Sequence, residues 1–256
     1  MRGLLPFLMS VPGRNRRSAT ATASIGTPAH GTCIKRDARS NIRDMEAQQT
    51  LPRRRGRPPK RPEQSLQTRE LLIRAGLEVL TEKGFSSTGI DEVLKRVGVP
   101  KGSFYHYFES KEAFGAELIE RYANYFGYKL ERHFNDESKR PLERLRAFVD
   151  DARDGMARHG FRRGCLIGNL GQEMGALPES FRGCLKAVFL DWQRRFARCL
   201  EKAQQRGEIP ASVDCEQTAA FFWIGWEGAV LRAKLERNAE PLEIFARGFF
   251  AGLQAA

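Results

Sequence analysis

The chain has 256 residues and carries 43 Lys and Arg against 31 Asp and Glu, a formal net charge of +12. Hydrophobic residues make up 41% and charged residues 29%, the usual mixture for a protein that buries a core. No run of residues approaches the ~18–20 uninterrupted apolar positions of a membrane-spanning helix, so we expect no integral membrane protein and no membrane partner.

The basic excess is concentrated in the first quarter of the chain. Residues 1–62 hold 14 Lys and Arg against 3 Asp and Glu, whereas residues 63–256 hold 29 against 28. The first segment contains one aromatic residue, Phe7, and no apolar periodicity. It cannot bury enough surface to offset the entropy of ordering, so we predict a disordered basic arm over residues 1–62.

The beginning of this arm has two interpretations. Residues 1–36 lack acidic side chains and are rich in Arg, Ser and Thr, which resembles a transit peptide. The interpretation that we favour is a start-site artefact, in which residues 1–44 are an upstream extension and translation starts at Met45. An intact-mass measurement of the native protein distinguishes the two.

The end of the arm carries a short basic motif. Its core is Arg55-Gly56-Arg57-Pro58, which resembles an AT-hook. Glycine lets an extended backbone enter a narrow minor groove, where flanking guanidinium groups meet a negative potential. The alternative is a solvated tail that attracts phosphate without specificity. The position of the motif directly before a predicted DNA-binding unit favours the first interpretation.

From Gln67 onward the sequence becomes helical. Apolar residues repeat at helical spacing up to Leu80, and Gly84 is placed to cap the end of this helix. Thr88 is the expected N-cap of a second helix, whose apolar stripe covers residues 90–97. The pattern therefore predicts a supporting helix followed by a short one.

A third helix is predicted over residues 103–108, after a turn that contains Gly98. Two short helices behind a supporting helix form a helix-turn-helix, whose second helix enters the major groove. Phe104 and Phe108 are four residues apart and are expected to face the core. His106 has no His or Cys at ligand spacing, so no metal site is expected there.

The residues around this motif resemble the DNA-binding region of TetR-family transcriptional regulators. The resemblance covers residues 67–114, and its most specific segments are residues 99–108 and 111–114. It implies an all-α fold, with a three-helix DNA-binding domain over residues 63–112 and a helical effector-binding and dimerisation domain over residues 113–256. The DNA contacts that we expect, including those of the arm, are Arg55, Arg57, Thr88, Lys101, Gly102, Ser103, Tyr105, His106, Tyr107 and Lys111.

The predicted DNA-binding domain is not basic as a whole. Residues 63–112 hold 7 basic and 8 acidic residues. Affinity for DNA must therefore come from the local placement of cations, from two copies in a dimer, and from the arm. Lys111, at the start of a long helix, is expected to reach phosphate beside free backbone N–H groups.

The rest of the chain is predicted to be helical almost throughout. The last two helices, over residues 219–237 and from Pro241, carry more aromatic and aliphatic surface than one amphipathic stripe needs. This surplus fits burial against a second copy, and the alternative is an ordinary monomer core. The family resemblance favours the homodimer, because these helices correspond to the four-helix interface of the family.

Five cysteines at scattered positions form no disulfide framework, and we expect a reducing cytoplasm. Cys184 and Cys199 lie in predicted helices and are expected to be buried apolar groups. Cys165 differs because it follows two arginines and begins a helix, features that favour its thiolate. Asn169 and Glu173 lie four and eight residues further on, along the same helical face.

A later helix places Trp223, Glu227 and Lys234 on one stripe. One interpretation is a salt bridge or solvent exposure near the helix end. The other is a small pocket between helices, with tryptophan walls and a few orienting polar groups.

Residues 160–174 and 223–229 look like the ligand domain of the acrylate-utilisation repressors of the TetR family, and Cys165 and Lys234 match positions in its electrophile-responsive branch. The resemblance implies a small carboxylate effector such as acrylate, which is also a Michael acceptor. Lys234 would neutralise the carboxylate, and Cys165 would either add to the β-carbon or only line the site. The expected effector-binding or sensing residues are Cys165, Asn169, Glu173, Trp192, Trp223, Trp226, Glu227 and Lys234.

The leading functional hypothesis is a ligand-controlled repressor. A homodimer binds double-stranded operator DNA in the bacterial cytoplasm, associated with the nucleoid, and a small-molecule effector favours a conformation that no longer fits the operator. The alternatives are a redox or electrophile sensor switched by covalent modification of Cys165, and an architectural binder of AT-rich DNA. We expect no enzyme, cofactor or metal, since no catalytic grouping, metal cluster or phosphate loop is found.

Overall fold

The computed structural model describes residues 62–255, and the regular secondary structure in this part is helical throughout. The predicted contacts Arg55 and Arg57 lie outside the described residues. No helix among those described is long and apolar enough to cross a membrane. The helices are α1 (Pro62–Lys83), α2 (Ile90–Val97), α3 (Lys101–Tyr107), α4 (Lys111–Phe134), α5 (Pro141–Ala157), α6 (Leu166–Gln172), α7 (Glu179–Gln205), α8 (Cys215–Glu236) and α9 (Glu240–Ala255).

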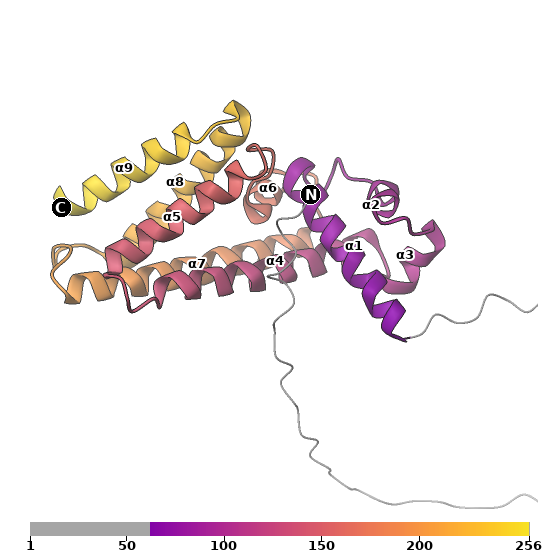
Figure 1. The fold of residues 1–256 in the computed structure, drawn as a ribbon, viewed down its shortest axis with the longest axis horizontal. Helices are drawn as coiled ribbons and strands as arrows, with labels where there is room; N and C mark the ends of the chain where they lie inside the picture. Colours follow the sequence, from indigo (N-terminus) through magenta and orange to yellow (C-terminus); the bar gives the residue numbers. More distant parts are fainter. Residues whose placement is uncertain (1–61, 256) are drawn as a thin grey trace, which may run out of the picture. The chain divides into compact units, whose positions relative to one another are not determined.

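The first three helices pack together beside the start of α4 (Figure 1). Phe104 of α3 and Phe108, which directly follows α3, are buried, as the sequence predicts, and both contact Phe114 of α4. The ring centroids are 5.3 Å apart for Phe104 and Phe114, and 4.7 Å apart for Phe108 and Phe114. The short helix α3 is therefore held by aromatic packing against α4.

Glycines in the left-handed region end α1 and α2. Gly84 has φ +85° and Gly98 has φ +65°, conformations that cost glycine little. The expected N-cap of α2 is wrong, because Gly89 occupies that position and makes no side-chain cap bond. Thr88 instead donates its hydroxyl to the Gly84 carbonyl at 2.6 Å, which closes the turn between the two helices.

Two other helix starts follow from capping. Ser110 caps α4 by accepting a hydrogen bond from the Ala113 N–H at 2.9 Å. Asp214 caps α8 in the same way through the Gln217 N–H, at 2.9 Å. Helix α8 consequently begins at Cys215, four residues before the start that apolar periodicity indicates.

Helices α4 to α9 enclose a second core. Helix α7 contacts α4, α5, α6 and α8, and α9 covers α8 (Figure 1). The core between them is largely aromatic, with Phe196 stacked on Phe222 at 4.2 Å between ring centroids. The expected division between residues 112 and 113 stays a prediction, since α4 begins at Lys111 and contacts both α1 and α7.

Part of the apolar surface of α8 and α9 is uncovered. Ile224 is 74% exposed and Leu235 is 76% exposed, and both lie on one face of α8 together with Phe221 and Leu231. Ile244 of α9 is 55% exposed. A monomer gains nothing by presenting large apolar side chains to water, so this stripe is typical of an association surface.

Of the two cysteines that are predicted to be buried, one is buried and the other is exposed. Cys199 is 2% exposed, as predicted. Cys184 is exposed, so the expectation that it is buried is wrong. The neighbouring residue Leu185 carries the buried position at this turn of α7, which leaves Cys184 on the outer face.

Candidate functional site: a recognition helix and an effector cleft joined by α6

Helix α3 presents a polar surface. Lys101, Gly102, Tyr105 and His106 are exposed, whereas Ser103 and Tyr107 are half-buried. The Lys101 ammonium lies 3.0 Å from Asp91 of α2, in a pair that is open to water on both sides. Such a pair contributes little to stability, so the lysine is free to exchange its carboxylate partner for a phosphate.

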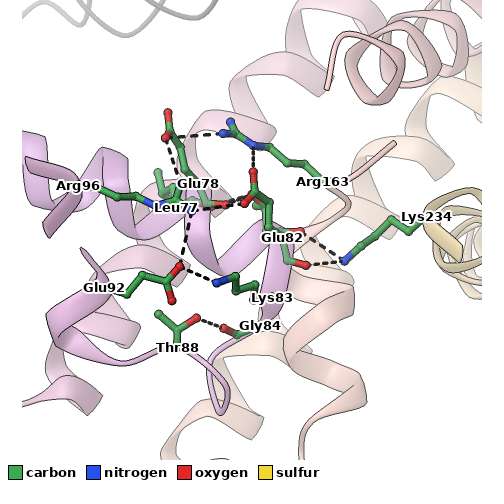
Figure 2. Close-up of polar contacts among 11 residues, drawn as sticks. Leu77, Glu78, Glu82, Lys83, Gly84, Thr88, Glu92, Arg96, Arg163 and Lys234 are labelled. Carbon is green, nitrogen blue, oxygen red and sulfur yellow. Dashed lines mark hydrogen bonds and ion pairs between the residues drawn. The ribbon is translucent and has the colours of Figure 1, made fainter. Parts of the chain in front are cut away.

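Two of the expected DNA contacts point inward instead. Thr88 is 3% exposed and its hydroxyl donates to the Gly84 carbonyl, as Figure 2 shows. We therefore correct its role from a side-chain DNA contact to a turn residue. Lys111 donates from Nζ to the Phe85 carbonyl at 2.9 Å and lies 4.4 Å from the centroid of the Phe85 ring. Burial lowers the pKa of Lys111, while the nearby Glu173 carboxylate opposes this shift.

Helix α6 binds the end of α1. The Asn169 side chain donates to the Thr81 carbonyl at 2.9 Å and to the Leu80 carbonyl at 3.3 Å. The Glu173 carboxylate accepts the backbone N–H groups of Phe85, at 3.1 Å, and Ser86, at 2.7 Å. Both side chains share a face, as predicted, but this face meets α1. They are therefore linking residues in this conformation, and their expected role as effector ligands stays a prediction.

Lys234 completes the same link from α8. Its Nζ donates to the Glu82 carbonyl at 3.4 Å (Figure 2). It also donates to the Thr81 carbonyl at 3.4 Å and to the Asn169 Oδ1 at 3.2 Å. Burial lowers the pKa of Lys234, with Arg237 adding to the shift. The ammonium is occupied by neutral acceptors at the C-terminal end of α1, a favourable place for a cation. Of the interpretations of the α8 stripe, a salt bridge between Lys234 and Glu227 is not found among the described residues.

An ion-pair cluster not anticipated from the sequence lies beside this link. Arg163, just before α6, and Arg96 of α2 share the carboxylates of Glu78 and Glu82 (Figure 2). The Arg163 Nε lies 3.2 Å from Glu82, and the Arg96 Nη2 lies 3.5 Å from the same carboxylate. The only sequence signal was the i,i+4 spacing of the two glutamates, which places them on one face of α1.

The thiol of Cys165 does not have the environment that the sequence suggests. Its Sγ caps α6 by accepting the Gly168 N–H at 3.4 Å. The expected cation, Arg163, is held by Glu82 and Glu78. Burial, reinforced by the Glu227 carboxyl, raises the pKa of Cys165 well above its usual value. The prediction of a favoured thiolate is wrong for this conformation.

Glu227 lines a cleft of about 270 Å³ between α6, α7 and α8. Its Oε1 is buried and has no hydrogen-bond partner among the described residues. Burial raises the pKa of Glu227 to about 7. A Cβ at position 168 would lie 1.9 Å from its Oε2, so a side chain there would force the Glu227 carboxyl to move. The other lining residues are Gly171, Gln172, Phe189, Gly228 and Leu231.

The three tryptophans are buried, but they are not equivalent. Trp192 and Trp223 lie 5.0 Å apart between ring centroids, and Trp192 also contacts the cleft residue Phe189 at 5.7 Å. The Trp223 Nε1 is a second buried polar atom without a partner in the described part of the chain. Trp226 instead stacks on Phe222 at 5.7 Å and lies 6.2 Å from the Phe245 ring of α9, between ring centroids, and its expected place in the pocket stays a prediction.

Tyr122 of α4 joins the site, although the sequence suggests only an apolar role for it. Its phenol interacts with Cys165, with Glu227 and with the backbone of Leu166, and burial raises the pKa of Tyr122 well above its usual value. A second cleft, of about 350 Å³, lies between α4 and α7 and includes Trp192 in its lining. Among the described residues, no three His, Cys, Asp or Glu side chains cluster to hold a metal ion.

Comparison with known proteins now fixes the family. Residues 72–118 match the bacterial regulatory proteins of the tetR family, and residues 141–249 match the tetracyclin repressor-like C-terminal domain. Transcriptional regulator AcuR of Cereibacter sphaeroides is 59% identical over 196 residues, which cover 77% of this chain and 89% of AcuR. The chain belongs to the TetR family of transcriptional regulators.

Other members of the TetR family resemble this regulator along most of its length. The HTH-type transcriptional repressor NemR of Escherichia coli K12 is 32% identical over 176 residues, covering 69% of this chain and 88% of NemR. The crystal structure of regulatory protein TetR from Rhodobacter sphaeroides has a TM-score of 0.69 at 59% identity, covering 70% of this chain and 95% of that chain. The reduced form of E. coli NemR has a TM-score of 0.66 at 32% identity, covering 72% and 95% respectively.

Proposed function

We propose that this TetR-family repressor binds a pseudo-palindromic operator as a homodimer and is released when a small carboxylic acid of the acrylate class occupies the Glu227 cleft. One observation carries the proposal. The short helix α6 lines the cleft with Gly168 and Gly171, and it holds the end of α1 with Asn169 and Glu173. A ligand that moves α6 must therefore disturb the support of the helix-turn-helix.

The homodimer is supported by the apolar stripe on α8 and α9, formed by Phe221, Ile224, Leu231, Leu235 and Ile244. Two-fold pairing of these helices would bury the stripe against its own copy. It would also fix the separation of two α3 helices, which must match successive major grooves about 34 Å apart. Binding to chromosomal operators places the protein in the bacterial cytoplasm, associated with the nucleoid.

The acrylate class is supported by the resemblance of residues 160–174 and 223–229 to acrylate-utilisation repressors. The test is release of labelled operator DNA from the purified regulator, followed by fluorescence anisotropy against a panel of small carboxylic acids and electrophiles. We expect short carboxylic acids to release the operator at concentrations where longer or branched acids do not. Operator binding that no small acid relieves would overturn the effector assignment.

A second candidate function is an electrophile sensor that acts through Cys165. The observation in its favour is the position of the thiol, which interacts with Glu227 and Tyr122 beside the cleft. Cys165→Ser separates the two mechanisms. Release by propionate that survives the substitution supports the ligand mechanism, and release by electrophiles alone, lost in the variant, supports the sensor.

A further inference from the structure

Two buried polar atoms on α8 lack hydrogen-bond partners in the described part of the chain. They are the Nε1 of Trp223, a residue that is 2% exposed, and the Oε1 of Glu227. The two residues are four positions apart, so their side chains leave the same face of the helix. Burying a polar atom without a partner is costly, and of the two only Glu227 lines the cleft, so its Oε1 is the atom that a ligand there would reach.

The cleft beside Glu227 is suited to a molecule of only a few heavy atoms. Its volume of about 270 Å³ lies just below the ~300–1,000 Å³ of common ligand pockets. On the α6 side, Gly168 and Gly171 carry no side chains, so the backbone of α6 itself forms this wall of the cleft. Its mouth, at Gly228 and Leu231, adjoins the apolar stripe, so the partner in the proposed dimer would border the opening.

Among the described residues, no cation is found among the groups that interact with Glu227. The titratable groups that interact with it are the Cys165 thiol at the start of α6 and the Tyr122 phenol on α4, both favoured in their neutral forms. Helix α7 contributes the Phe189 ring to the cleft. Helix α9 meets α8 through Phe245, which packs against Gly225.

The cations of Lys234 and Arg163 are already bound to other partners. The ammonium of Lys234 is bonded to Asn169 and to two α1 carbonyls, and the guanidinium of Arg163 is paired with Glu78 and Glu82. An ionised Glu227 would therefore repel a carboxylate in the cleft without any compensating charge. A protonated Glu227 would instead donate a hydrogen bond to it.

We infer that the cleft takes up a small carboxylate together with one proton, which Glu227 holds and donates to the ligand. No covalent bond forms or breaks. The proton comes from solvent and resides on the Glu227 carboxyl, so the occupied site carries one negative charge rather than two. This inference rests on the proposed function only in placing the effector in the Glu227 cleft.

Calorimetric titration of the full-length regulator with propionate tests the inference. Propionate has the size of acrylate but cannot add to a thiol. Titrations at each pH in two buffers of different ionisation enthalpy give the number of protons taken up. Because burial raises the pKa of Glu227 to about 7, we expect about 0.9 proton per site at pH 8 and about 0.1 at pH 6. The apparent Kd should rise toward tenfold per pH unit above pH 7.

Glu227→Gln is the matched variant, because the amide donates a hydrogen bond at every pH. It should bind propionate without proton uptake and with the same affinity at pH 6 and pH 8.

The outcomes distinguish this inference from the proposed function. Propionate binding at pH 8 without proton uptake, or with the same uptake in Glu227→Gln, overturns the inference even if propionate releases the operator. A regulator that binds its operator but binds no propionate at either pH overturns both the inference and the acid effector. If the wild-type protein binds no operator DNA, the proposal that it is a repressor is overturned.

Discussion

The side chains of Asn169 and Lys234 are hydrogen-bonded to each other at 3.2 Å, and both end on the last carbonyl groups of α1. One residue comes from α6 and the other from α8, so the two helices that border the effector cleft hold the same point of the DNA-binding region. The carbonyls at the end of a helix lack intrahelical partners, which makes this link part of the capping of α1.

Lys234→Met should therefore destabilise the regulator. Methionine keeps an unbranched stem beside Gly164 and Val230 but leaves the Asn169 Oδ1 and two carbonyls without the ammonium. We expect a loss of about 1–3 kcal/mol, seen as a fall in Tm of roughly 2–4 °C per kcal/mol. Lys186→Met, at an exposed position on α7, is the control. Equal Tm values for the two variants would contradict the link.

Alanine substitutions at Gly84 and Gly98 separate two costs, the backbone strain of a positive φ and the steric clash of a new Cβ with a neighbouring side chain. Both have positive φ, but a Cβ on Gly84 would lie 1.6 Å from the Glu173 Oε1, whereas one on Gly98 meets nothing within 4 Å. Gly98→Ala should cost about 1–2 kcal/mol of strain. Gly84→Ala should cost at least about 2 kcal/mol more, because Glu173 must leave the N–H groups of Phe85 and Ser86. Denaturant unfolding measures both, and similar losses would refute the role of Glu173.

Lys101→Ala tests the recognition helix. If the exposed ammonium binds phosphate, operator affinity should fall in similar proportion for all operator sequences. The slope of log K against log salt should become shallower by about 1 for each lysine removed, or about 2 for a dimer. Lys186→Ala on α7 should change neither quantity. An unchanged slope for Lys101→Ala would show that this lysine stays with Asp91 on DNA.

The raised pKa of Glu227 predicts that the unfolding free energy of the effector-free protein depends on pH. Its folded-state pKa is raised from 4.5 to about 7, so the folded state binds more protons than the unfolded state between these values. Its contribution to stability is fully present below about pH 4.5 and is lost as the pH rises through about 7. The difference in unfolding free energy between Glu227→Gln and the wild type should therefore grow across this window, by about 1–3 kcal/mol. A constant difference would contradict a buried carboxyl.

The two cysteines of contrasting environment predict an order of alkylation. Cys184 is exposed, while burial and Glu227 raise the pKa of Cys165 well above its usual value. Because the thiolate is the reactive form, iodoacetamide at pH 7.5 should modify Cys184 at least about tenfold faster than Cys165. Peptide mapping over time measures both rates within one sample. Faster modification of Cys165 would favour the electrophile sensor.

Local patterns were sufficient for most of the helices and for the inward faces of Phe104 and Phe108. They were insufficient where a tertiary partner decides the role of a polar side chain. The spacing of Cys165, Asn169 and Glu173 correctly places the last two on one face, but spacing alone does not say that α1 lies against it. Similarly, the two arginines before Cys165 suggest an activated thiol only while the glutamates of α1, eighty residues earlier, are ignored.

The buried groups of the cleft show the same limit. Tyr122 reads as one more apolar position of α4, because its phenol acquires a function only beside Cys165 and Glu227. The three tryptophans are alike in the sequence, and only packing separates Trp226, which stacks on Phe222, from Trp223, whose N–H has no partner among the described residues. Glu227 and Lys234 lie on the same stripe of α8, yet Glu227 lines the cleft whereas Lys234 donates hydrogen bonds to carbonyl groups of α1.

Helix α4 runs without a break from Lys111 to Phe134, so a tilt of the helix would move both of its ends. Its first turn carries Lys111 and Phe114, which hold Phe85 and the aromatic core under α3, and Tyr122 stands beside the cleft. A tilt of about 10° about Tyr122 would displace Lys111, roughly 17 Å along the axis, by about 3 Å. Repeated in both protomers of a dimer, a displacement of this size would shift two recognition helices relative to a groove spacing that DNA holds constant.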